Sequence, residues 1–287
     1  MDIKGTTRVC GLIGNPVGHS VSPAIHNNLA RLTGKDMVYT TFKVEKGDVA
    51  SAVRGAYSLN ILGLNVTVPH KSEVIDSLVD IDPLAKAIGA VNTLVRVDGG
   101  FKGYNTDILG LARELEDEGI ELADSKVIIL GAGGAARAIT FLCSSKGAKK
   151  IYLLNRTVDK AEAIAQAVNA HFNNDKVIPM NIADIPGDDY IVIQTTSVGL
   201  HPNDTAVVID DEAFYKKAAV GVDIIYNPGE TMFMKLIKAQ GKKAYNGLKM
   251  LLYQGVSAYE LWNDCKITKE EADEVYKCLQ KELGINE

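Results

Sequence analysis

The chain has 287 residues, 46% hydrophobic and 23% charged, which is normal for a globular protein of one large or two ordinary domains. A net charge of −5 without a long basic run argues against a dedicated nucleic-acid surface. The five histidines and four cysteines show no metal-ligand spacing, so we expect no structural metal. Neither a signal peptide nor an apolar run long enough to span a bilayer is visible, which favours a cytoplasmic protein without a membrane partner.

In the first third of the chain, β-prone segments alternate with helical ones, which is typical of α/β layers with largely parallel sheets. Ser22-Pro23 is a predicted helix start, with serine as the N-cap and proline at the first helical position. The turn DGG joins two strands in a predicted hairpin. The predicted strands are 8–13, 37–44, 61–68, 90–97 and 101–105, and the predicted helices are 22–32 and 47–57.

The remainder of the chain changes character after a helix predicted over 107–118. A strand–turn–helix–strand unit begins at Lys126, strands are predicted at 191–196 and 219–225, and helices at 248–264 and 268–284. We place domain boundaries near 106 and 245 and expect the tail to return to the first domain. The prediction is a substrate domain of residues 1–106 plus 245–287 and a dinucleotide-binding domain of residues 107–244.

A glycine-rich turn follows the apolar strand of that second domain. Residues Gly131, Ala132, Gly133, Gly134, Ala135 and Ala136 fit GxGxxA between a strand and a helix. Glycines there permit a tight turn and close approach to a pyrophosphate, while the helix N-terminus supplies free N–H groups. Glycines also serve ordinary strand–helix turns, but this context favours nucleotide binding. No GK[ST] follows, which excludes a P-loop kinase or GTPase.

The end of the next strand indicates which dinucleotide is bound. NAD sites usually carry an acid there for the ribose 2′-hydroxyl, whereas this chain has Asn155, Arg156 and Thr157. A guanidinium and a hydroxyl suit a 2′-phosphate, which favours NADP. Two alternatives remain: Arg156 is a solvated surface charge, or Asp159 is the ribose ligand rather than a residue of the helix start.

Several polar side chains of the first domain stand at strand ends and turns: Ser20, Ser22, Asn65, Thr67, Lys71, Asn92 and Asp107. Taken singly, each has an ordinary structural explanation as a cap, a turn residue or a solvated charge. Taken together, they fit a polyhydroxylated substrate bound at the carboxyl ends of parallel strands, where Lys71 and Asn92 would lie close. Hydride transfer to a carbonyl also needs a proton donor, and Lys71 can serve if Asp107 holds its ammonium in place.

The chain resembles the shikimate dehydrogenase family in many separated motifs that occur in the same order. These are GNPVGHSVSPAIHN (14–27), LNVTVPHK (64–71), GAVNTLV (89–95), GYNTD (103–107), GAGGAARA (131–138), NRT (155–157), TSVGL (196–200), DIIYNP (223–228) and NGLKMLLYQG (246–255). The resemblance implies two α/β domains: a substrate domain completed by C-terminal helices, and a Rossmann-type NADP-binding domain.

The resemblance further implies reversible NADP-dependent reduction of 3-dehydroshikimate to shikimate, in aromatic amino-acid biosynthesis. Lys71 and Asp107 match the catalytic pair of the family. Ser20 and Ser22 match the ligands of the substrate carboxylate. The other implied substrate ligands are Asn65, Thr67, Asn92, Tyr226 and Gln254. The implied cofactor contacts, besides the glycine-rich turn and residues 155–157, are Thr196, Ser197, Gly247 and Met250.

The chain departs from the family pattern at Gln194-Thr195, where Asn-Ala is common, and at Lys249, where glycine is common. These departures concern nicotinamide positioning more than substrate binding. The alternatives are a quinate/shikimate dehydrogenase that uses NAD or NADP, with NAD a weaker possibility as cofactor, and a regulator that binds NADP without turnover. The sequence leaves a monomer and a homodimer equally open.

Overall fold

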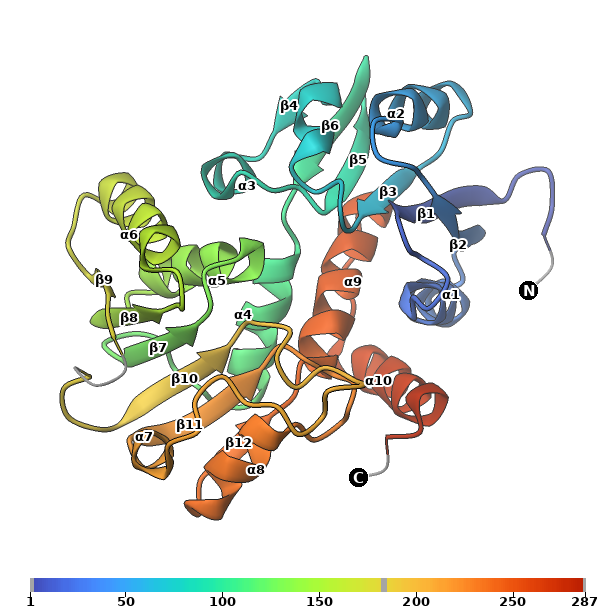
Figure 1. The fold of residues 1–287 in the computed structure, drawn as a ribbon. Helices are drawn as coiled ribbons and strands as arrows, with labels where there is room; N and C mark the ends of the chain where they lie inside the picture. The colour runs from blue at the N-terminus through green and yellow to red at the C-terminus, as the bar shows by residue number, and fades with distance from the viewer. Residues whose placement is uncertain (1–2, 182–184, 286–287) are drawn as a thin grey trace. The chain divides into compact units, whose positions relative to one another are not determined.

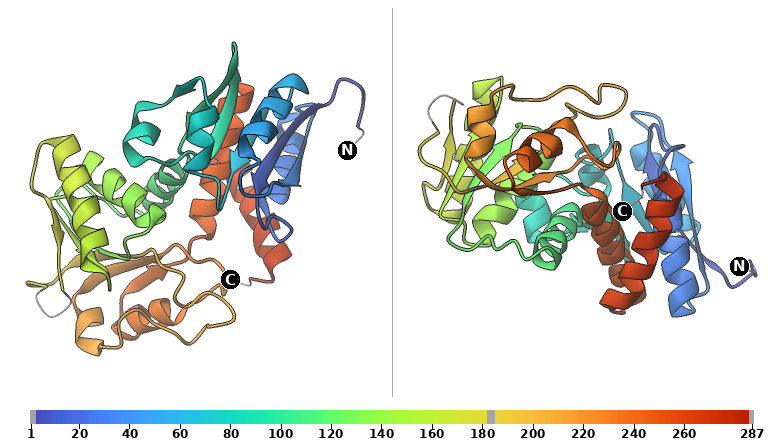
Figure 2. Two further views of the ribbon diagram at one scale, coloured as in Figure 1. Left: turned by 45° about the horizontal axis from the view of Figure 1, so that its top comes forward. Right: turned by 90° about the horizontal axis from the view of Figure 1, so that it is seen from below.

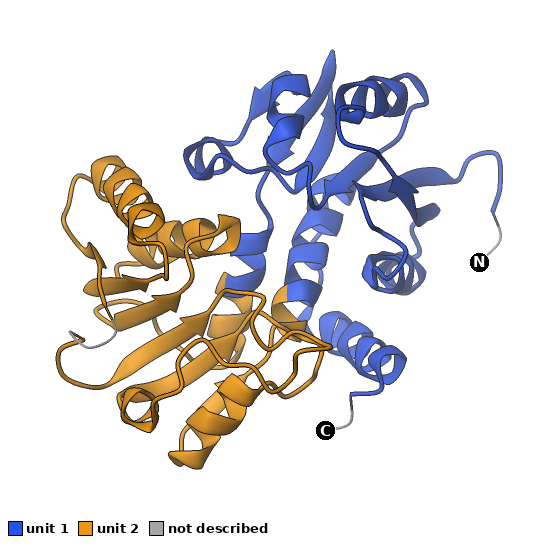
Figure 3. Ribbon diagram, in the orientation of Figure 1, with its two compact units in different colours: residues 1–111, 251–287 blue, residues 112–250 orange. Residues whose placement is uncertain are grey.

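The computed structural model describes residues 3–181 and 185–285, which form two compact units. Unit 1 comprises residues 1–111 and 251–287, and unit 2 comprises residues 112–250 (Figure 3). The chain passes from one unit to the other inside helix α4 (Asp107–Asp117) and again inside helix α9 (Leu248–Asn263). The boundaries predicted near 106 and 245 lie a few residues before these two points.

Unit 1 is built on a six-stranded mixed sheet in the order β2-β1-β3-β5-β6-β4. The strands β1, β2 and β3 run parallel, whereas β5 pairs with both β3 and β6 in antiparallel fashion, the latter pair forming the predicted hairpin. The strand bounds are β1 Arg8–Gly14, β2 Met37–Lys43, β3 Gly63–Val66, β4 Asp80–Ile81, β5 Thr93–Val97 and β6 Gly100–Tyr104.

The antiparallel pairing corrects one expectation from the sequence. Asn92 directly precedes β5, so it stands at the amino end of that strand rather than at a carboxyl end. Because β5 runs opposite to β3, with Asn65 in register with Thr93, its amino end nevertheless lies beside the carboxyl end of β3. The polar residues therefore do meet at one sheet edge, for a different reason from the one predicted.

Helices α1 (Ser22–Thr33) and α10 (Lys269–Leu283) pack side by side in unit 1 (Figure 2). The N-cap of α1 is Val21 and makes no side-chain capping bond, so the prediction that Ser22 caps this helix is wrong. Ser22 is instead already helical, with Pro23 in the first turn. By contrast, Thr268 and Glu271 form a capping box at the start of α10, each side chain accepting a backbone N–H of the other residue.

Helix α9 is fixed to the sheet of unit 1 by Trp262. The Trp262 indole N–H donates to the Leu94 carbonyl at 2.9 Å, which satisfies its only donor in a buried position. The ring lies so close to Gly63 that a Cβ there would be 2.1 Å from the indole nitrogen. Only glycine fits at that point of β3, and its missing side chain leaves room for the Trp262 ring, so α9 can pack against this sheet.

The sequence predicted the smaller elements of unit 1 only in part. Helix α2 (Val49–Ser58) agrees with the prediction near 47–57. The strand predicted over 61–68 is shorter, since only Gly63–Val66 pairs in the sheet before the chain turns at Pro69. A 3-10 helix η1 (Glu73–Ser77) and helix α3 (Pro83–Ile88) follow without having been predicted.

Unit 2 is a Rossmann-type fold with six parallel strands in the order β12-β11-β10-β7-β8-β9 (Figure 1). Its strands are nearly continuous runs of buried residues, because a parallel sheet is covered on both faces. The bounds are β7 Lys126–Leu130, α5 Gly134–Ser145, β8 Lys150–Leu154, α6 Val158–Phe172, β9 Val177–Pro179, β10 Tyr190–Gln194, α7 Glu212–Lys216, β11 Ala218–Asp223, α8 Met232–Ala239 and β12 Lys243–Tyr245.

Strand order reverses between β7 and β10, the point at which folds of this type bind ligands. Across the part of the chain that the structure describes, no helix combines the length and apolarity needed to cross a membrane. The same residues contain no group of three or more His, Cys, Asp or Glu side chains that could hold a metal ion.

A buried acid stands in the part of α4 that belongs to unit 2. Glu114 is 1% exposed, and neither carboxyl oxygen has a hydrogen-bond partner among the described residues. Burial raises the pKa of Glu114 to about 8, and the neighbouring Glu118 acts in the same direction while Lys249 opposes it. Lys249 itself binds the carboxylates of Asp117, at 2.6 Å, and Glu118. Glu114 is therefore protonated in the folded protein at neutral pH.

We expect Glu114→Gln to stabilise the protein increasingly as pH rises. The acid has a higher pKa in the folded than in the unfolded chain, so the parent loses stability between about pH 4.5 and pH 8. The difference in free energy of unfolding between variant and parent should grow over this interval by on the order of a few kcal/mol. Urea denaturation at pH 5 and at pH 9 measures it.

Glu116→Gln is the matched control, because Glu116 lies on the same helix but is exposed. This control should show no comparable growth with pH. A Glu114→Gln effect of equal size at both pH values would contradict a buried, protonated acid.

Candidate active site

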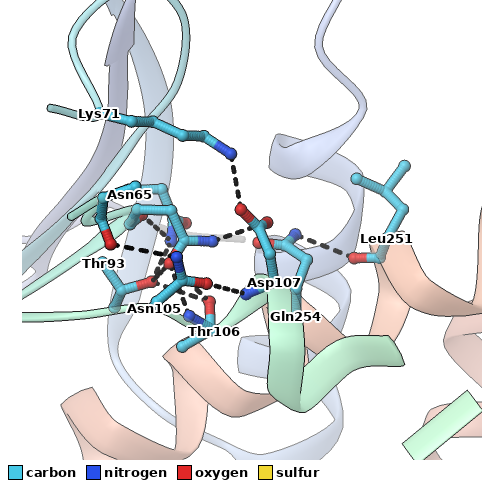
Figure 4. Close-up of polar contacts among 10 residues, drawn as sticks. Asn65, Lys71, Thr93, Asn105, Thr106, Asp107, Leu251 and Gln254 are labelled. Atoms are coloured by element: carbon cyan, nitrogen blue, oxygen red, sulfur yellow. Dashed lines mark hydrogen bonds and ion pairs between the residues drawn. The ribbon is translucent and has the colours of Figure 1, made fainter. Parts of the chain in front are cut away.

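Lys71 and Asp107 form an ion pair in unit 1 (Figure 4). The Lys71 Nζ lies 2.6 Å from Oδ2 of Asp107, and the two side chains are 33% and 24% exposed. Lys71 stands in the turn after β3, while Asp107 is the first residue of α4. Asp107 therefore begins a helix, as the predicted helix over 107–118 requires, and it also holds the Lys71 ammonium. A lysine and carboxylate held together but reachable by solvent can exchange a proton with a small molecule.

The main chain around Lys71 is fixed by its buried neighbours. His70 is fully buried, and its Nε2 lies 2.8 Å from the carbonyl oxygen of Val44. The Val91 N–H donates to the Lys71 carbonyl at 2.8 Å, which ties the turn to the segment before β5. These two contacts fix the main chain from which the Lys71 side chain extends toward Asp107.

Asn92 links Asp107 to the sheet. The backbone N–H of Thr106 donates to Oδ1 of Asn92 at 2.7 Å, so the amide oxygen must face that donor. The Nδ2 group then faces Asp107 and donates to Oδ1 at 2.8 Å. Asp107 thus accepts from Asn92 at one oxygen and from Lys71 at the other, which suits an ionised carboxylate.

Three further residues of this network did not emerge from the sequence. The hydroxyls of Thr93 and Thr106 are buried and bond Oδ1 of Asn92 at 3.0 and 3.1 Å. Asn105 accepts from the Asp107 N–H at 3.2 Å and donates to the Ala90 carbonyl at 3.1 Å, fixing the start of α4 (Figure 4). Both Asn105 and Thr106 lie in the GYNTD motif, where only the aspartate had been singled out.

Asn65 connects to the same network through its amide. Its Nδ2 donates to Oγ1 of Thr93 at 3.1 Å and to the Asn92 carbonyl at 3.3 Å. Its Oδ1 accepts from the hydroxyl of Tyr39 at 2.8 Å, and Tyr39 is a further residue that the sequence did not indicate. Hydrogen bonds thus run continuously from Tyr39 to Lys71.

The remaining candidates of unit 1 are Ser20, Ser22, Thr67 and Gln254. Ser20 donates to the Ser22 hydroxyl at 3.1 Å, so these two serines act as one polar group. Thr67 is partly buried, and its methyl group packs against Gly14: a Cβ built on that glycine would lie 2.3 Å from the methyl carbon. Gln254 is buried on α9 and donates to the Leu251 carbonyl at 2.9 Å (Figure 4).

In unit 2 the glycine-rich turn has the features that a dinucleotide requires. Gly131 has φ +113°, and a Cβ there would lie 2.7 Å from Oγ1 of Thr195, so glycine is needed. Gly133 is the N-cap of α5 and offers no side-chain cap. A Cβ built on Gly133 or Gly134 meets nothing within 4 Å, so the helix N-terminus is open to a phosphate group. Ala132 and Ala135 are partly buried beside it.

The end of β8 also fits a phosphorylated ribose. Asn155 donates to the Thr157 carbonyl at 2.8 Å, which shapes the turn, while Arg156 and Thr157 are exposed. Asp159 is exposed in the first turn of α6, the position of a helix-start acid. An exposed guanidinium without a competing acid at the strand end suits a 2′-phosphate.

Gln194 is the last residue of β10, Thr195 follows it, and both are buried. Gln194 accepts the Thr196 N–H and donates to the Val198 carbonyl at 3.0 Å, closing the turn that contains Ser197. Thr195 donates to the Leu130 carbonyl at 2.6 Å, immediately before Gly131. Thr196 is partly exposed and Ser197 exposed. Gln194 and Thr195 therefore each hold a turn at the carboxyl edge of the sheet.

The other candidates of unit 2 lie after β11 or at the start of α9. Tyr226 is partly buried three residues past β11, and burial raises its pKa. A Cβ on Gly247 would lie 2.2 Å from the Ile224 carbonyl oxygen, so this glycine is needed for close backbone packing. Met250 is partly buried on α9, next to Lys249, whose ion pairs explain a lysine where the family often has glycine.

Comparison with known proteins agrees with this geometry over nearly the whole chain. A family model described as the shikimate dehydrogenase substrate binding domain matches residues 12–94. A second, described as shikimate / quinate 5-dehydrogenase, matches residues 111–207. The shikimate dehydrogenase (NADP(+)) of Bacillus anthracis is 43% identical over 259 residues, which cover 90% of this chain and 93% of that protein.

Solved structures show the same architecture. A shikimate dehydrogenase in complex with NADP+ is 37% identical, with a TM-score of 0.88 and 97% of each chain covered. Shikimate 5-dehydrogenase from Listeria monocytogenes, in complex with shikimate and NAD, is 30% identical, with a TM-score of 0.88 and 97% and 98% covered. On its family matches, its close relatives and its two-unit α/β fold, the chain belongs to the shikimate dehydrogenase family.

Proposed function

We propose that this protein catalyses the reversible NADP-dependent reduction of 3-dehydroshikimate to shikimate, a reaction of aromatic amino-acid biosynthesis. The observation that carries the proposal is the Lys71–Asp107 ion pair, held by Asn92 in a chain that belongs to this family. Burying a polar network of this kind removes several polar groups from water, which is unfavourable for folding. Such networks are found where a reaction uses the buried groups.

Lys71 is the proposed proton donor and acceptor. In reduction, its ammonium gives a proton to the carbonyl oxygen as that carbon gains hydride, and the neutral amine then regains a proton from solvent. In oxidation, the neutral amine takes the hydroxyl proton. Asp107 keeps Nζ in position, while Asn92 keeps Asp107 from rotating. The bound NADP supplies or accepts the hydride.

The substrate-binding set offers the groups that a hydroxylated acid requires. The Ser20 and Ser22 hydroxyls suit the carboxylate, because hydroxyls donate to anionic oxygens without adding charge. Asn65, Thr67, Asn92, Gln254 and Tyr226 are the proposed contacts for the hydroxyl groups and the rest of the ring. Asn65, Thr67 and Asn92 lie in β3 or beside the ends of β3 and β5, within the matched substrate-domain family model. Gln254 lies on α9 and Tyr226 lies after β11, and their proposed roles rest on the family resemblance.

The NADP-binding residues that we propose lie in unit 2. Residues 131–135 would bind the pyrophosphate through backbone N–H groups, and Arg156, with Asn155 and Thr157, would bind the 2′-phosphate. Thr196, Ser197, Gly247 and Met250 are the proposed contacts nearer the nicotinamide. NAD remains the weaker alternative, because the end of β8 lacks an acid for the ribose.

We further infer a cytoplasmic enzyme that acts on a small molecule without nucleic acid or membrane partners. All four cysteines are free, which suits a reducing compartment. We propose a monomer or a homodimer. Light scattering during gel filtration would exclude both if it gave the mass of a larger assembly.

The direct test measures kcat/KM of the purified protein for shikimate and quinate, each with NADP and NAD. We expect the highest value for shikimate with NADP. Comparable values for quinate would instead establish the quinate/shikimate dehydrogenase alternative. No shikimate-dependent reduction of NADP from pH 6 to 10, with NADP still bound, would favour a regulator and contradict the proposal.

Lys71→Ala should lower kcat by roughly 10²- to 10⁴-fold and leave NADP affinity nearly unchanged, because the lysine serves the reacting oxygen. Steady-state kinetics measure the first effect, and titration that follows the fluorescence of reduced NADP (NADPH) measures the second. Lys102→Ala is the matched control: Lys102 also pairs with an aspartate in unit 1, Asp80 at 2.7 Å, outside the site. An unchanged kcat for Lys71→Ala would remove this lysine from the mechanism.

Arg156→Ala should raise KM for NADP by about tenfold or more and change KM for NAD little, since NAD has no 2′-phosphate. Lys146→Ala removes an exposed charge at the C-cap of α5, the opposite end from the glycine-rich turn, and serves as the control. Equal losses for NADP and NAD would show that Arg156 does not read the 2′-phosphate.

A further inference from the structure

A buried aromatic pair in unit 1 has no role in the proton transfer, substrate binding or cofactor binding proposed above. Tyr39 of β2 is 2% exposed, and His26 of α1 is fully buried. Their rings stack with centroids 4.2 Å apart and planes 14° apart. Resting on the proposed function, we infer that Tyr39 is a positioning residue of the substrate site, which fixes the Asn65 amide so that its oxygen accepts from a substrate hydroxyl.

The first step is the orientation of the Asn65 amide. The carbonyl oxygen of Asn92 can only accept, so it must face Nδ2 of Asn65. The opposite side of the amide, Oδ1, then faces Tyr39, and the phenol has to donate its single proton across 2.8 Å. Burial raises the pKa of Tyr39 well above its usual range, which keeps that proton on the phenol.

The second step concerns what Asn65 can still offer a ligand. Both Nδ2 hydrogens have acceptors, one at the Asn92 carbonyl and one at Thr93 Oγ1. Oδ1 has accepted one bond from Tyr39 and retains a second acceptor site. Asn65 can therefore recognise a hydroxyl that donates, and it is ill suited to a group that only accepts. Without the Tyr39 hydroxyl, Oδ1 loses its donor, and the amide is held in this orientation only by the acceptors on its Nδ2 side.

The third step is what holds the phenol in place. His26 packs flat on Tyr39, and Trp262 lies against the imidazole at 5.0 Å between ring centroids. Burial lowers the pKa of His26 to about 3, which the neighbouring Asn65 amide opposes, so the ring is neutral. Neither ring nitrogen makes a hydrogen bond of good geometry among the described residues. Helix α9 approaches at Gly255, where a Cβ would lie 3.6 Å from Nε2 of His26.

The stack therefore touches three elements that carry proposed substrate ligands. Ser22 and His26 share α1, and the Ser22 hydroxyl is the second polar neighbour of the Tyr39 phenol. Asn65 belongs to β3, and Gln254 precedes Gly255 on α9. A purely structural tyrosine would stabilise the core without favouring one polarity of the Asn65 amide. The position of its hydroxyl, between two proposed ligands of one substrate, gives Tyr39 a role in recognition.

Tyr39→Phe tests this role because it removes only the hydroxyl. We expect KM for shikimate to rise by about tenfold, with kcat changed by less than about threefold and KM for NADP unchanged. In an Asn65→Ala background the same substitution should have little further effect, because Tyr39 acts through Asn65. Shikimate analogues that each lack one hydroxyl complete the test: for one of them, the parent and Tyr39→Phe should have nearly the same KM.

Tyr259→Phe is the matched control. Tyr259 is buried near the same imidazole, at 6.4 Å between centroids, but its hydroxyl bonds Thr33 rather than a proposed substrate ligand. It should lower thermal stability and leave KM for shikimate within about twofold. If Tyr39→Phe behaves like Tyr259→Phe in an active parent, Tyr39 is structural and the inference fails. An inactive parent would instead contradict the proposed function itself.

Discussion

The hydrogen bond from the Thr106 N–H to Oδ1 of Asn92 sets the polarity of the whole polar network in unit 1. A backbone N–H can only donate, so it decides which way the Asn92 amide faces. Asp107 then receives the Nδ2 donor at one oxygen and has its other oxygen available for Lys71. Reversing that amide would place its acceptor oxygen against a carboxylate oxygen of Asp107, and the two would repel each other. The proposed proton donor thus depends on a main-chain group that no side-chain motif reveals.

The same reasoning extends to Asn65, whose amide is also oriented by a main-chain group, the carbonyl of Asn92. Both asparagines are buried, and a buried amide with its donors and acceptors reversed would leave several groups unpaired. The cost of that arrangement keeps the site in one state before substrate binds. Preorganisation of this kind lowers the entropy that binding would otherwise lose.

In unit 2, the departures from the family pattern are accommodated by local compensation. The longer Gln194 side chain bonds the turn after β10 and also reaches Oδ1 of the buried Asp223, at 3.4 Å. Asp223 in turn accepts from the Thr231 hydroxyl at 2.7 Å and from the Ile225 N–H at 3.0 Å. Lys249 is neutralised by Asp117 and Glu118. These substitutions therefore keep the turns and charges in balance, and they leave the glycine-rich turn open.

The sequence by itself determined the alternation of strands and helices, the Rossmann-type unit and the chemistry of the polar set, because strand periodicity and glycine requirements are local properties. It also supplied Lys71 and Asp107 as a pair through the family resemblance. Tertiary structure decided that β5 runs antiparallel to β3, that Ser22 does not cap α1, and that Thr93, Asn105, Thr106 and Tyr39 support the site. The strand pairing and the contacts of Tyr39 and Thr106 join residues far apart in the chain, where local patterns do not show which donor meets which acceptor. The cap of α1 and the bonds of Thr93 to Asn92 and of Asn105 to Asp107 are local, but they depend on side-chain geometry that the residue types alone leave open.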